Sequence, residues 1–366
     1  MIGLALSGGG SRAAAFHLGC LRALDDLGLL DRIQVISTIS GGSIIGAYFA
    51  YSPHKSFSDF DSDMCMLLKK GLQKDIVLEA LKPKNLIRSS MNGLVEKFDR
   101  FVSSILKKDP SLLRYPTRTD MFIDVLNREL FAGLKVSAKR RNDMDIVIGA
   151  CELRTGTAFR FSNRRAGDWK HGELIDWNID LACAVAASAA YPFLLPALDR
   201  KWRFQKNGQD TFHRVILTDG GVYDNLGVQV LEPSRDPDIS LHTFPCEYLV
   251  VCNAGRGQDD VSSIPVDFVP RVARSLEIAH RRVQESTMRR LHHLRETGQI
   301  KGFVMPYLGQ QDIKLINLPS DFITRSDVVN YPTDFAPMSD EWIRKLAGRG
   351  EQLTKNLIYR YLTELL

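Results

Sequence analysis

The sequence predicts an α/β fold with a mainly parallel central sheet and a helical insertion. Strand and helix patterns alternate over the first fifty residues, which indicates that the first strands pair in parallel. Residues 52–135 then carry almost no strand pattern and indicate several helices instead. An apolar content of 44% over 366 residues is sufficient for a large core. We therefore expect one domain over residues 1–366, with residues 52–135 as an insertion or lid.

The remaining elements follow from apolar periodicity and from proline and glycine breaks. Helices are expected in the insertion at 57–71, 73–82, 91–107 and 118–132. Later strands are expected at 144–150, 157–162, 214–218, 247–252 and 301–305. Two long helices, near 268–295 and 339–366, should form a C-terminal helical region over 268–366 that packs on the sheet.

A glycine-rich loop follows the first strand. Residues 2–6 form a short apolar strand, and residues 7–12 read Ser-Gly-Gly-Gly-Ser-Arg. Residues 13–27 then have the apolar spacing of a helix that stops at Gly28. Glycines at a helix N-terminus expose N–H groups beside the positive end of the helix dipole. Such a loop binds either a phosphate group or the oxyanion of an acyl-transfer transition state.

Phosphate binding is a competing interpretation of this loop. Gly8, Gly10 and Ala13 formally match the dinucleotide fingerprint G-x-G-x-x-G/A. That fingerprint also requires an acidic residue at the end of the second strand. Here the second strand ends in residues 38–41 (Thr-Ile-Ser-Gly), without a carboxylate. A non-catalytic lipid- or nucleotide-binding protein therefore remains an alternative, although a less favoured one.

Ser40 stands between a strand pattern and a helix pattern. The β-branched run of residues 35–39 ends at Ser40, two glycines follow, and residues 44–50 resume as an apolar helix. A nucleophile elbow requires this order, because only small residues tolerate the crowded backbone beside the exposed serine. Thr38 stands where the motif G-x-S-x-G has its first glycine. Taken alone, the pattern fits an ordinary strand-to-helix turn equally well.

A carboxylate turn follows a later strand. Residues 215–217 are apolar, and Asp219, Gly220 and Gly221 come directly after Thr218. An ordinary Asx turn explains this segment in isolation. Combined with Ser40 and the glycine loop, the segment indicates a base at a strand end that can face the serine.

Together these segments resemble the patatin-like phospholipases, which are lipid acyl hydrolases with a Ser-Asp dyad. Four segments match in chain order: the glycine loop, the Ser40 turn, residues 186–193 (Ala-Ala-Ser-Ala-Ala-Tyr-Pro-Phe) and the Asp219 turn. The sequence departs from the family at Thr38, where glycine is usual. Residues 331–335 (Tyr-Pro-Thr-Asp-Phe) resemble a family segment near the C-terminus more weakly. The resemblance implies a patatin-like three-layer sandwich.

The resemblance also implies an acyl-enzyme mechanism on the carboxylic esters of lipids or phospholipids. Ser40 would be the nucleophile and Asp219 its base, while Arg12 would add positive field beside the oxyanion hole. No cofactor is implied, and no acidic cluster has the ligand spacing of a calcium site. The expected site residues are Ser40 and Asp219 as catalytic groups, Gly8, Gly9 and Gly10 as the oxyanion hole, and Arg12, Gly42, Gly220 and Gly221 as supporting residues.

A Ser-His-Asp triad on an α/β-hydrolase is the competing enzymatic mechanism. It would require a histidine after the acid in the chain. His242 precedes an apolar strand, and His280, His292 and His293 lie in an arginine-rich helical stretch. None of these histidines stands in a recognisable loop after a strand, so we favour the dyad.

The positive charge of the chain concentrates in two places. Residues 64–108 hold ten Lys and Arg against four Asp and Glu, whereas the whole chain has a net charge of +5. Phe98 and Phe101 lie there at helical spacing among basic residues, as in a helix on an anionic bilayer, although packing on the core is the simpler role. Arginines also gather in the helix at 268–295, but all around it, which favours a solvated helix over nucleic-acid binding.

Composition bounds the cellular setting. Six scattered cysteines without C-x-x-C spacing fit free thiols in a reducing compartment. No run approaches the length of a transmembrane helix, and the first strand follows Met1 directly without a leader pattern. We therefore expect a cytoplasmic enzyme with a lipid substrate, transient contact with a membrane surface and no nucleic-acid partner.

Overall fold

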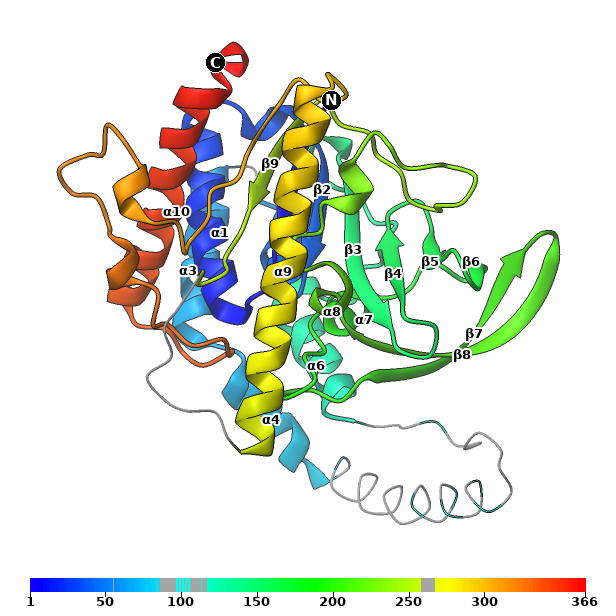
Figure 1. Cartoon of the computed structure of the whole chain (residues 1–366). Helices are drawn as coiled ribbons and strands as arrows, with labels where there is room; N and C mark the ends of the chain where they lie inside the picture. Colours follow the sequence, from blue (N-terminus) through cyan, green and yellow to red (C-terminus); the bar gives the residue numbers. More distant parts are fainter. Residues whose placement is uncertain are drawn as a thin grey trace.

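The structure is a computed structural model, and Figure 1 shows the path of the chain. It describes residues 1–54, 56–83, 85, 97, 99, 101, 103, 105, 113, 117–257 and 267–366. Within these residues, ten strands join in one sheet in the order β10-β9-β1-β2-β3-β4-β5-β6-β7-β8. The strands are β1 (Ile2–Leu6), β2 (Ile33–Ile39), β3 (Asp145–Glu152), β4 (Thr157–Ser162), β5 (Ala166–Asp168), β6 (Gly172–Leu174), β7 (Leu198–Lys206), β8 (Gln209–Asp219), β9 (Tyr248–Cys252) and β10 (Gly302–Val304).

Helices connect and cover the strands. Those that matter below are α1 (Gly10–Asp26), α2 (Gly41–Tyr51), α3 (Phe57–Lys70), α4 (Gln73–Leu81), α6 (Arg118–Leu126), α7 (Leu181–Ser188), α8 (Gly221–Asp224), α9 (Phe268–Glu296) and α10 (Asp340–Tyr361). No helix in the described part of the chain combines the length and the apolar character needed to cross a membrane.

One half of the sheet is parallel. Strands β10, β9, β1, β2 and β3 lie side by side and run in the same direction. The crossover from β1 to β2 contains α1, and the crossover from β2 to β3 contains α2, α3, α4 and α6. This half follows from the strand–helix alternation at the start of the sequence, because parallel neighbours need long connections.

The other half is a closed antiparallel ring, and it corrects the predicted sheet. Strands β3 to β8 pair antiparallel in chain order, and β8 returns to pair with β3, so that six strands close into a small barrel. The prediction of a mainly parallel central sheet is therefore wrong. The physical reason is the length of the connections: segments such as 153–156 and 207–208 are too short for a parallel crossover.

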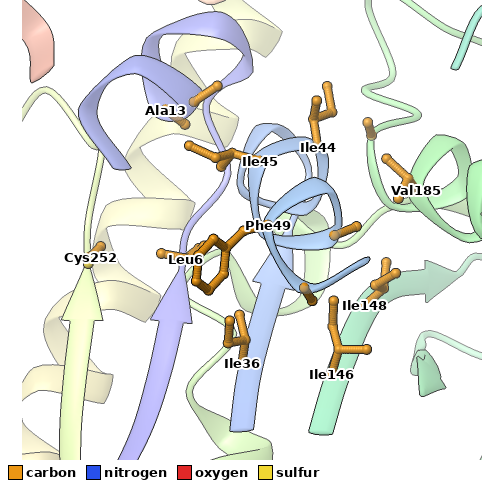
Figure 2. Close-up of a cluster of buried hydrophobic side chains, with 14 of the residues drawn as sticks. Leu6, Ala13, Ile36, Ile44, Ile45, Phe49, Ile146, Ile148, Val185 and Cys252 are labelled. Carbon is orange, nitrogen blue, oxygen red and sulfur yellow. The ribbon is translucent and has the colours of Figure 1, made fainter. Parts of the chain in front are cut away.

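Apolar side chains on the two faces of the parallel half enter two separate cores. Leu4, Ile36 and Ile146 lie on the face covered by α1, α2 and α10. Their neighbours Ala5 and Val35 point to the opposite face, where residues of α9 cover them. Figure 1 shows α9 crossing in front of the sheet, and Figure 2 shows the first core between α2 and the strands.

Three of the helices predicted in the insertion are present. The predicted helices at 57–71 and 73–82 correspond to α3 and α4, and the first part of the one predicted at 118–132 corresponds to α6. Apolar residues of these helices, among them Phe60, Met64 and Phe122, belong to the first core. Of the predicted helix at 91–107, only residues 97, 99, 101, 103 and 105 are described, and all five are helical; Phe98 and most of the basic flank lie outside the described residues. The long C-terminal helices are also present, although α10 ends at Tyr361 rather than at the end of the chain.

Candidate active site

Ser40 forms a sharp turn between β2 and α2. Its backbone has φ 53° and ψ −120°, a conformation that costs a non-glycine residue about 1–3 kcal/mol and usually persists only where the surroundings enforce it. The surroundings here are backbone atoms. A Cβ on Gly41 would lie 2.2 Å from the carbonyl oxygen of Gly10, and one on Gly42 would lie 2.3 Å from that of Leu6. Residues 41 and 42 must therefore be glycine.

The Thr38 side chain, where the family usually has glycine, has its own space and partners. A Cβ on Gly46 would lie 2.5 Å from the Thr38 methyl group, so glycine at position 46 leaves room for this methyl. The Thr38 hydroxyl accepts a hydrogen bond from Ser43 Oγ at 3.0 Å and reaches the carbonyl oxygen of Val147 at 3.3 Å. The departure from the motif is thus compensated inside the elbow.

The β3 register brings Asp219 to Ser40. On one edge of β3, Gly149 pairs with Ile39 of β2 and the next residue, Ala150, pairs with Asp219 of β8. Strand β4 occupies the other edge of β3, so the carboxyl ends of β2 and β8 meet head to head. Because Ser40 follows Ile39 directly, the serine and the aspartate become neighbours although they are 179 positions apart in the chain.

The Asp219 carboxylate is buried and only partly satisfied. Oδ1 accepts a hydrogen bond from the Gly221 N–H at 2.7 Å, whereas Oδ2 has no hydrogen-bond partner. Burial raises the pKa of Asp219 to about 6, although the Ser40 side chain and the Gly221 N–H favour the ionised form and offset part of this effect. Asp219 is therefore a stronger base than an ordinary aspartate and still ionised at neutral pH.

The glycine loop lies against the Ser40 turn. A Cβ on Gly8 would lie 3.2 Å from Ser40 Cβ and 2.4 Å from Asn225 Oδ1. The Gly8 N–H already donates to the carbonyl oxygen of Asn225 at 3.1 Å. Gly9 and Gly10 have φ 142° and 59° and stand at the start of α1, where N–H groups lack acceptors within the helix. The N–H groups of Gly9 and Gly10 are thus the donors best placed to bind an oxyanion.

Arg12 ties the glycine loop to distant segments. The buried guanidinium donates from Nε to the carbonyl oxygen of Ala254 at 3.2 Å and from Nη1 to that of Tyr331 at 3.2 Å. The adjacent Ser11 N–H donates to the carbonyl oxygen of Asp334 at 2.8 Å. The segment 331–335, singled out in the sequence, therefore supports the loop from the C-terminal third of the chain.

Comparison with known families agrees with this geometry. The model of the patatin-like phospholipases matches residues 4–231, which include the glycine loop, Ser40 and Asp219. The chain belongs to the patatin-like phospholipase family. No match is found among curated protein sequences.

Solved structures add a likeness in fold to the family match. Human GIVD cytosolic phospholipase A2 is 13% identical, with a TM-score of 0.51 over 97% of this chain and 58% of its own. The same human protein in complex with methyl gamma-linolenyl fluorophosphonate and terbium chloride is 14% identical, with a TM-score of 0.49 over 97% and 57%. VipD from Legionella pneumophila is 13% identical, with a TM-score of 0.38 over 98% and 67%. The chain thus spans little more than half of the human phospholipase.

Hydroxyl groups that the sequence did not single out for a role hold the patatin-like elbow in place. Ser188 Oγ, at the end of α7, accepts from the Ser40 N–H at 2.9 Å and donates to the carbonyl oxygen of Gly149 at 2.6 Å. Ser43 Oγ lies 2.8 Å from Ser188 Oγ. Ser188 lies in the matched segment 186–193, so the sequence pattern could have indicated its role. The part played by Ser43 depends on contacts between distant segments and leaves no sequence pattern.

The Asp219 turn is positioned by the same segment. The N–H of Asp219 donates to the carbonyl oxygen of Ala190 at 3.0 Å. The N–H of Gly220 donates to the carbonyl oxygen of Ser188 at 3.1 Å. A Cβ on Gly220 would lie 2.2 Å from the carbonyl oxygen of Gly149, which requires glycine at this position. The supporting glycines of this patatin-like site thus permit close backbone contact between β3 and the turn.

No histidine bonds to the Asp219 carboxylate; all eight histidines lie in the described part of the chain. The His242 ring hydrogen-bonds instead to the carbonyl oxygen of Arg165 at 3.2 Å, and burial lowers its pKa to about 3. His280 lies on α9, where it lines the cleft described below, and no hydrogen bond joins it to Asp219. Among the described residues, Asp219 therefore has no histidine partner of the kind that a Ser-His-Asp triad needs.

One buried group of residues could hold a metal. Ligand atoms of His17, Cys20 and Cys252 lie within 4.8 Å of one another behind the glycine loop. The His17 Nε2 atom bonds to the carbonyl oxygen of Ser7 at 2.9 Å, and all six cysteines are free. All three side chains are buried, and Cys20 and Cys252 belong to the first core, so we assign them no step in catalysis.

A cleft opens beside the glycine loop. It has a volume of about 370 Å³ and lies between α9 and the segment that follows β9. Arg12, Asn225 and Thr333, which contact the glycine loop, form its inner end. The patatin-like site therefore continues outward into a second space beyond the loop.

Proposed function

We propose that this protein is a lipid acyl hydrolase in which Ser40 attacks the carbonyl carbon of a carboxylic ester. The observation that carries the proposal is the meeting of a strained serine with a buried carboxylate whose Oδ2 has no partner. A serine hydroxyl is a weak nucleophile until a neighbouring base takes its proton. Asp219 Oδ2 is available for that proton, because Oδ1 is occupied by the Gly221 N–H.

The reaction would proceed in two halves. Ser40 Oγ bonds to the ester carbon while its proton passes to Asp219, and the carbonyl oxygen becomes an oxyanion beside the glycine loop. Each well-placed N–H donor at such an oxyanion contributes about 10²–10³ in rate. The tetrahedral intermediate expels the alcohol, which takes the proton from Asp219. Water then attacks the acyl-enzyme with Asp219 again as the base, and the fatty acid leaves.

The insertion over residues 52–135 is proposed as the lid of this site. The backbone N–H groups of Leu72 and Gln73, at the start of α4, donate to the carbonyl oxygen of Phe335 at 2.9 and 3.0 Å. The Phe335 ring packs on Phe122 of α6 with 5.5 Å between ring centroids. Asp334, the neighbour of Phe335, accepts a hydrogen bond from the Ser11 N–H of the glycine loop. Movement of the insertion would therefore shift the N–H groups proposed to bind the oxyanion.

An exposed apolar strip on the insertion supports contact with a lipid surface. Val77, Leu78 and Leu81 of α4 are each more than half exposed. Exposed large apolar side chains at this spacing form one side of a helix and favour a partner that is itself apolar. We place transient membrane docking here, beside the entrance through which a lipid would reach Ser40.

The direct test is fluorophosphonate labelling combined with esterase assays on a medium-chain ester. The wild type should be labelled at Ser40. Ser40→Ala should lose labelling and lower kcat by about 10⁴-fold or more, and Asp219→Asn should lower kcat by about 10²–10⁴-fold. Ser137→Ala, which changes an exposed serine, is the matched control and should retain wild-type activity. Full activity in Asp219→Asn would show that another group is the base.

A further inference from the structure

The cleft beside the glycine loop is rich in guanidinium groups. Among the described residues that line it, four are arginines, namely Arg12, Arg256, Arg274 and Arg281, and one is a carboxylate, Glu277. Arg274 Nη1 pairs with Glu277 at 3.1 Å across one turn of α9. The charge of Arg256 and Arg281 is therefore not neutralised by the lining carboxylate.

Two of these arginines are held on the same oxygen. Arg12 Nη1 and Arg256 Nη2 both donate to the carbonyl oxygen of Tyr331, at 3.2 and 3.0 Å. Two guanidinium groups on one neutral acceptor repel each other, and an anion in the adjacent space would relieve that repulsion. The two arginines come from distant parts of the chain, Arg12 from α1 and Arg256 from the segment after β9. The fold therefore brings the two guanidinium groups together.

Arg281 of α9 lines the same cleft, and one of its buried N–H donors makes no hydrogen bond to a described residue. This Nε atom is buried without a hydrogen-bond partner, and its ion pair with Glu285 Oε1 on the same helix is a long one, at 3.8 Å. An unmade hydrogen bond of a buried charged donor is costly, and such groups commonly mark the place of an ion. Arginine forks bind phosphate oxygens in pairs, which suits three guanidinium groups converging on one cavity.

We propose that this cleft binds the terminal phosphate of a phosphomonoester head group, so that the preferred substrate is a phospholipid of the phosphatidic acid type. The proposal rests on the function proposed above, because it places the scissile ester at Ser40. Asn225 connects the two places: its side chain contacts the positions of both Gly8 and Gly221, and it also lines the cleft. A glycerol backbone above Asn225 would bring an ester to Ser40 and its phosphate to the arginines.

The charge of the cleft selects among head groups. A phosphomonoester carries about 1.5 to 2 negative charges at pH 7, which can be shared among several guanidinium groups. A choline phosphodiester carries a single negative charge and a bulky cation that the arginines would repel. A neutral diglyceride offers the arginines no negative charge. Phosphatidic acid should therefore be hydrolysed faster than phosphatidylcholine, and phosphatidylcholine faster than diacylglycerol.

The test measures kcat/KM on these three lipids with identical acyl chains in neutral detergent micelles, and on the soluble ester p-nitrophenyl butyrate. For the wild type we expect kcat/KM on phosphatidic acid to exceed that on phosphatidylcholine by about 10-fold or more. In Arg256→Gln and Arg281→Gln, the ratio of kcat/KM on phosphatidic acid to that on p-nitrophenyl butyrate should fall by about 10- to 100-fold. Arg281→Lys keeps the charge without the fork and should fall in between.

Arg282→Gln is the matched control, because Arg282 is the next residue on α9 and its side chain is 69% exposed. That variant should keep the wild-type ratio. Inorganic phosphate should compete with phosphatidic acid in the wild type and lose this competition in Arg281→Gln. Competition by phosphate without any preference for phosphatidic acid would mean that the cleft holds free phosphate, which overturns the substrate assignment.

Two failures can be told apart. Equal hydrolysis of the three lipids by an active wild type, or equal losses on phosphatidic acid and p-nitrophenyl butyrate in the arginine variants, would overturn the head-group proposal alone. A wild type that neither hydrolyses p-nitrophenyl butyrate nor reacts with a fluorophosphonate would overturn the proposed function, and the substrate assignment with it.

Discussion

The parallel half of the sheet and the antiparallel ring supply different parts of the candidate site. The parallel half contributes Ser40 and the glycine loop, both at the carboxyl ends of strands whose helices begin with glycine. The ring contributes Asp219 and the 188–190 segment that fixes its backbone. Strand β3 belongs to both halves, and its two consecutive residues Gly149 and Ala150 align them. The site therefore depends on the joint between the halves rather than on either half alone.

The joint can be broken from either side by adding one methyl group. Gly41→Ala would clash with the Gly10 carbonyl in the parallel half, and Gly220→Ala with the Gly149 carbonyl in the ring, both at 2.2 Å. We expect each substitution to lower the free energy of unfolding by about 3 kcal/mol, measured by urea denaturation. Gly156→Ala, where φ is positive but nothing lies within 4 Å, is the control and should cost about 1 kcal/mol. Equal losses of stability at all three positions would contradict the claim that close backbone contacts hold the two halves together at residues 41 and 220.

The buried base should make the ring side of the joint sensitive to pH. Because the pKa of Asp219 is raised to about 6 in the folded protein, its stabilising contribution is complete below pH 4 and is lost as pH rises through 6. Asp219→Asn should therefore be more stable than the wild type by about 2–3 kcal/mol at pH 7 and about equally stable at pH 4. Urea denaturation at both pH values measures this, and a difference that does not depend on pH would contradict the assigned pKa.

The same group should govern activity with the opposite dependence on pH. In the proposed mechanism ionised Asp219 accepts the Ser40 proton, so wild-type kcat/KM should rise with pH through about 6. Stability and activity should then change in opposite directions over the same pH range, because the ionisation that destabilises the fold is the one that the proposed mechanism requires.

A smaller effect is expected from the hydroxyl that links the halves. Ser188→Ala leaves the Ser40 N–H and the Gly149 carbonyl without their partner in a buried place. We expect a loss of about 1–3 kcal/mol in the free energy of unfolding, together with a fall in kcat, because the elbow loses its anchor. Ser137→Ala serves again as the exposed control, and a stable Ser188→Ala with normal kcat would show that the elbow does not need this bond.

The smallest effect is expected at the far end of the ring. Asn207 and Gly208 form the two-residue turn between β7 and β8, with φ 50° and 75°. Gly208→Ala should lower the free energy of unfolding by about 1 kcal/mol and leave kcat unchanged, because the turn lies eleven residues from Asp219 along β8. A marked loss of activity would mean that the ring transmits distortion from its tip to the site.

The two halves also differed in how far the sequence could predict them. Alternating apolar strands and helices predicted the parallel pairing of β1 and β2, because each element carries its own periodicity. The ring was not predicted, because β7 reads Leu-Asp-Arg-Lys-Trp-Arg-Phe-Gln-Lys and has few apolar residues. The Asn207-Gly208 pair is a strong hairpin signal that would have revealed it.

The site residues divide in a similar way. Ser40, Asp219 and the glycine loop each stand at a strand end with glycines alongside, which a sequence pattern can express. The supporting contacts of Ser43 and Asn225 join segments that are distant in the chain, and their side chains look like any others in the sequence. Ser188 lies in the matched segment 186–193, but that pattern alone gave it no role. The catalytic roles of the first group stay predictions until the labelling experiment is done.

The support given by the 331–335 segment has a consequence for how much of the chain the site needs. The family match ends at residue 231, and Ser40, Asp219 and the glycine loop all lie within the matched portion. The acceptors for the Ser11 N–H and for Arg12 Nη1, at Asp334 and Tyr331, lie about a hundred residues further on, and the acceptor for Arg12 Nε is Ala254. The matched portion therefore does not contain all the contacts that hold its own glycine loop. Grafting the first 231 residues onto another protein would transfer the proposed catalytic residues without part of the scaffold that holds the glycine loop.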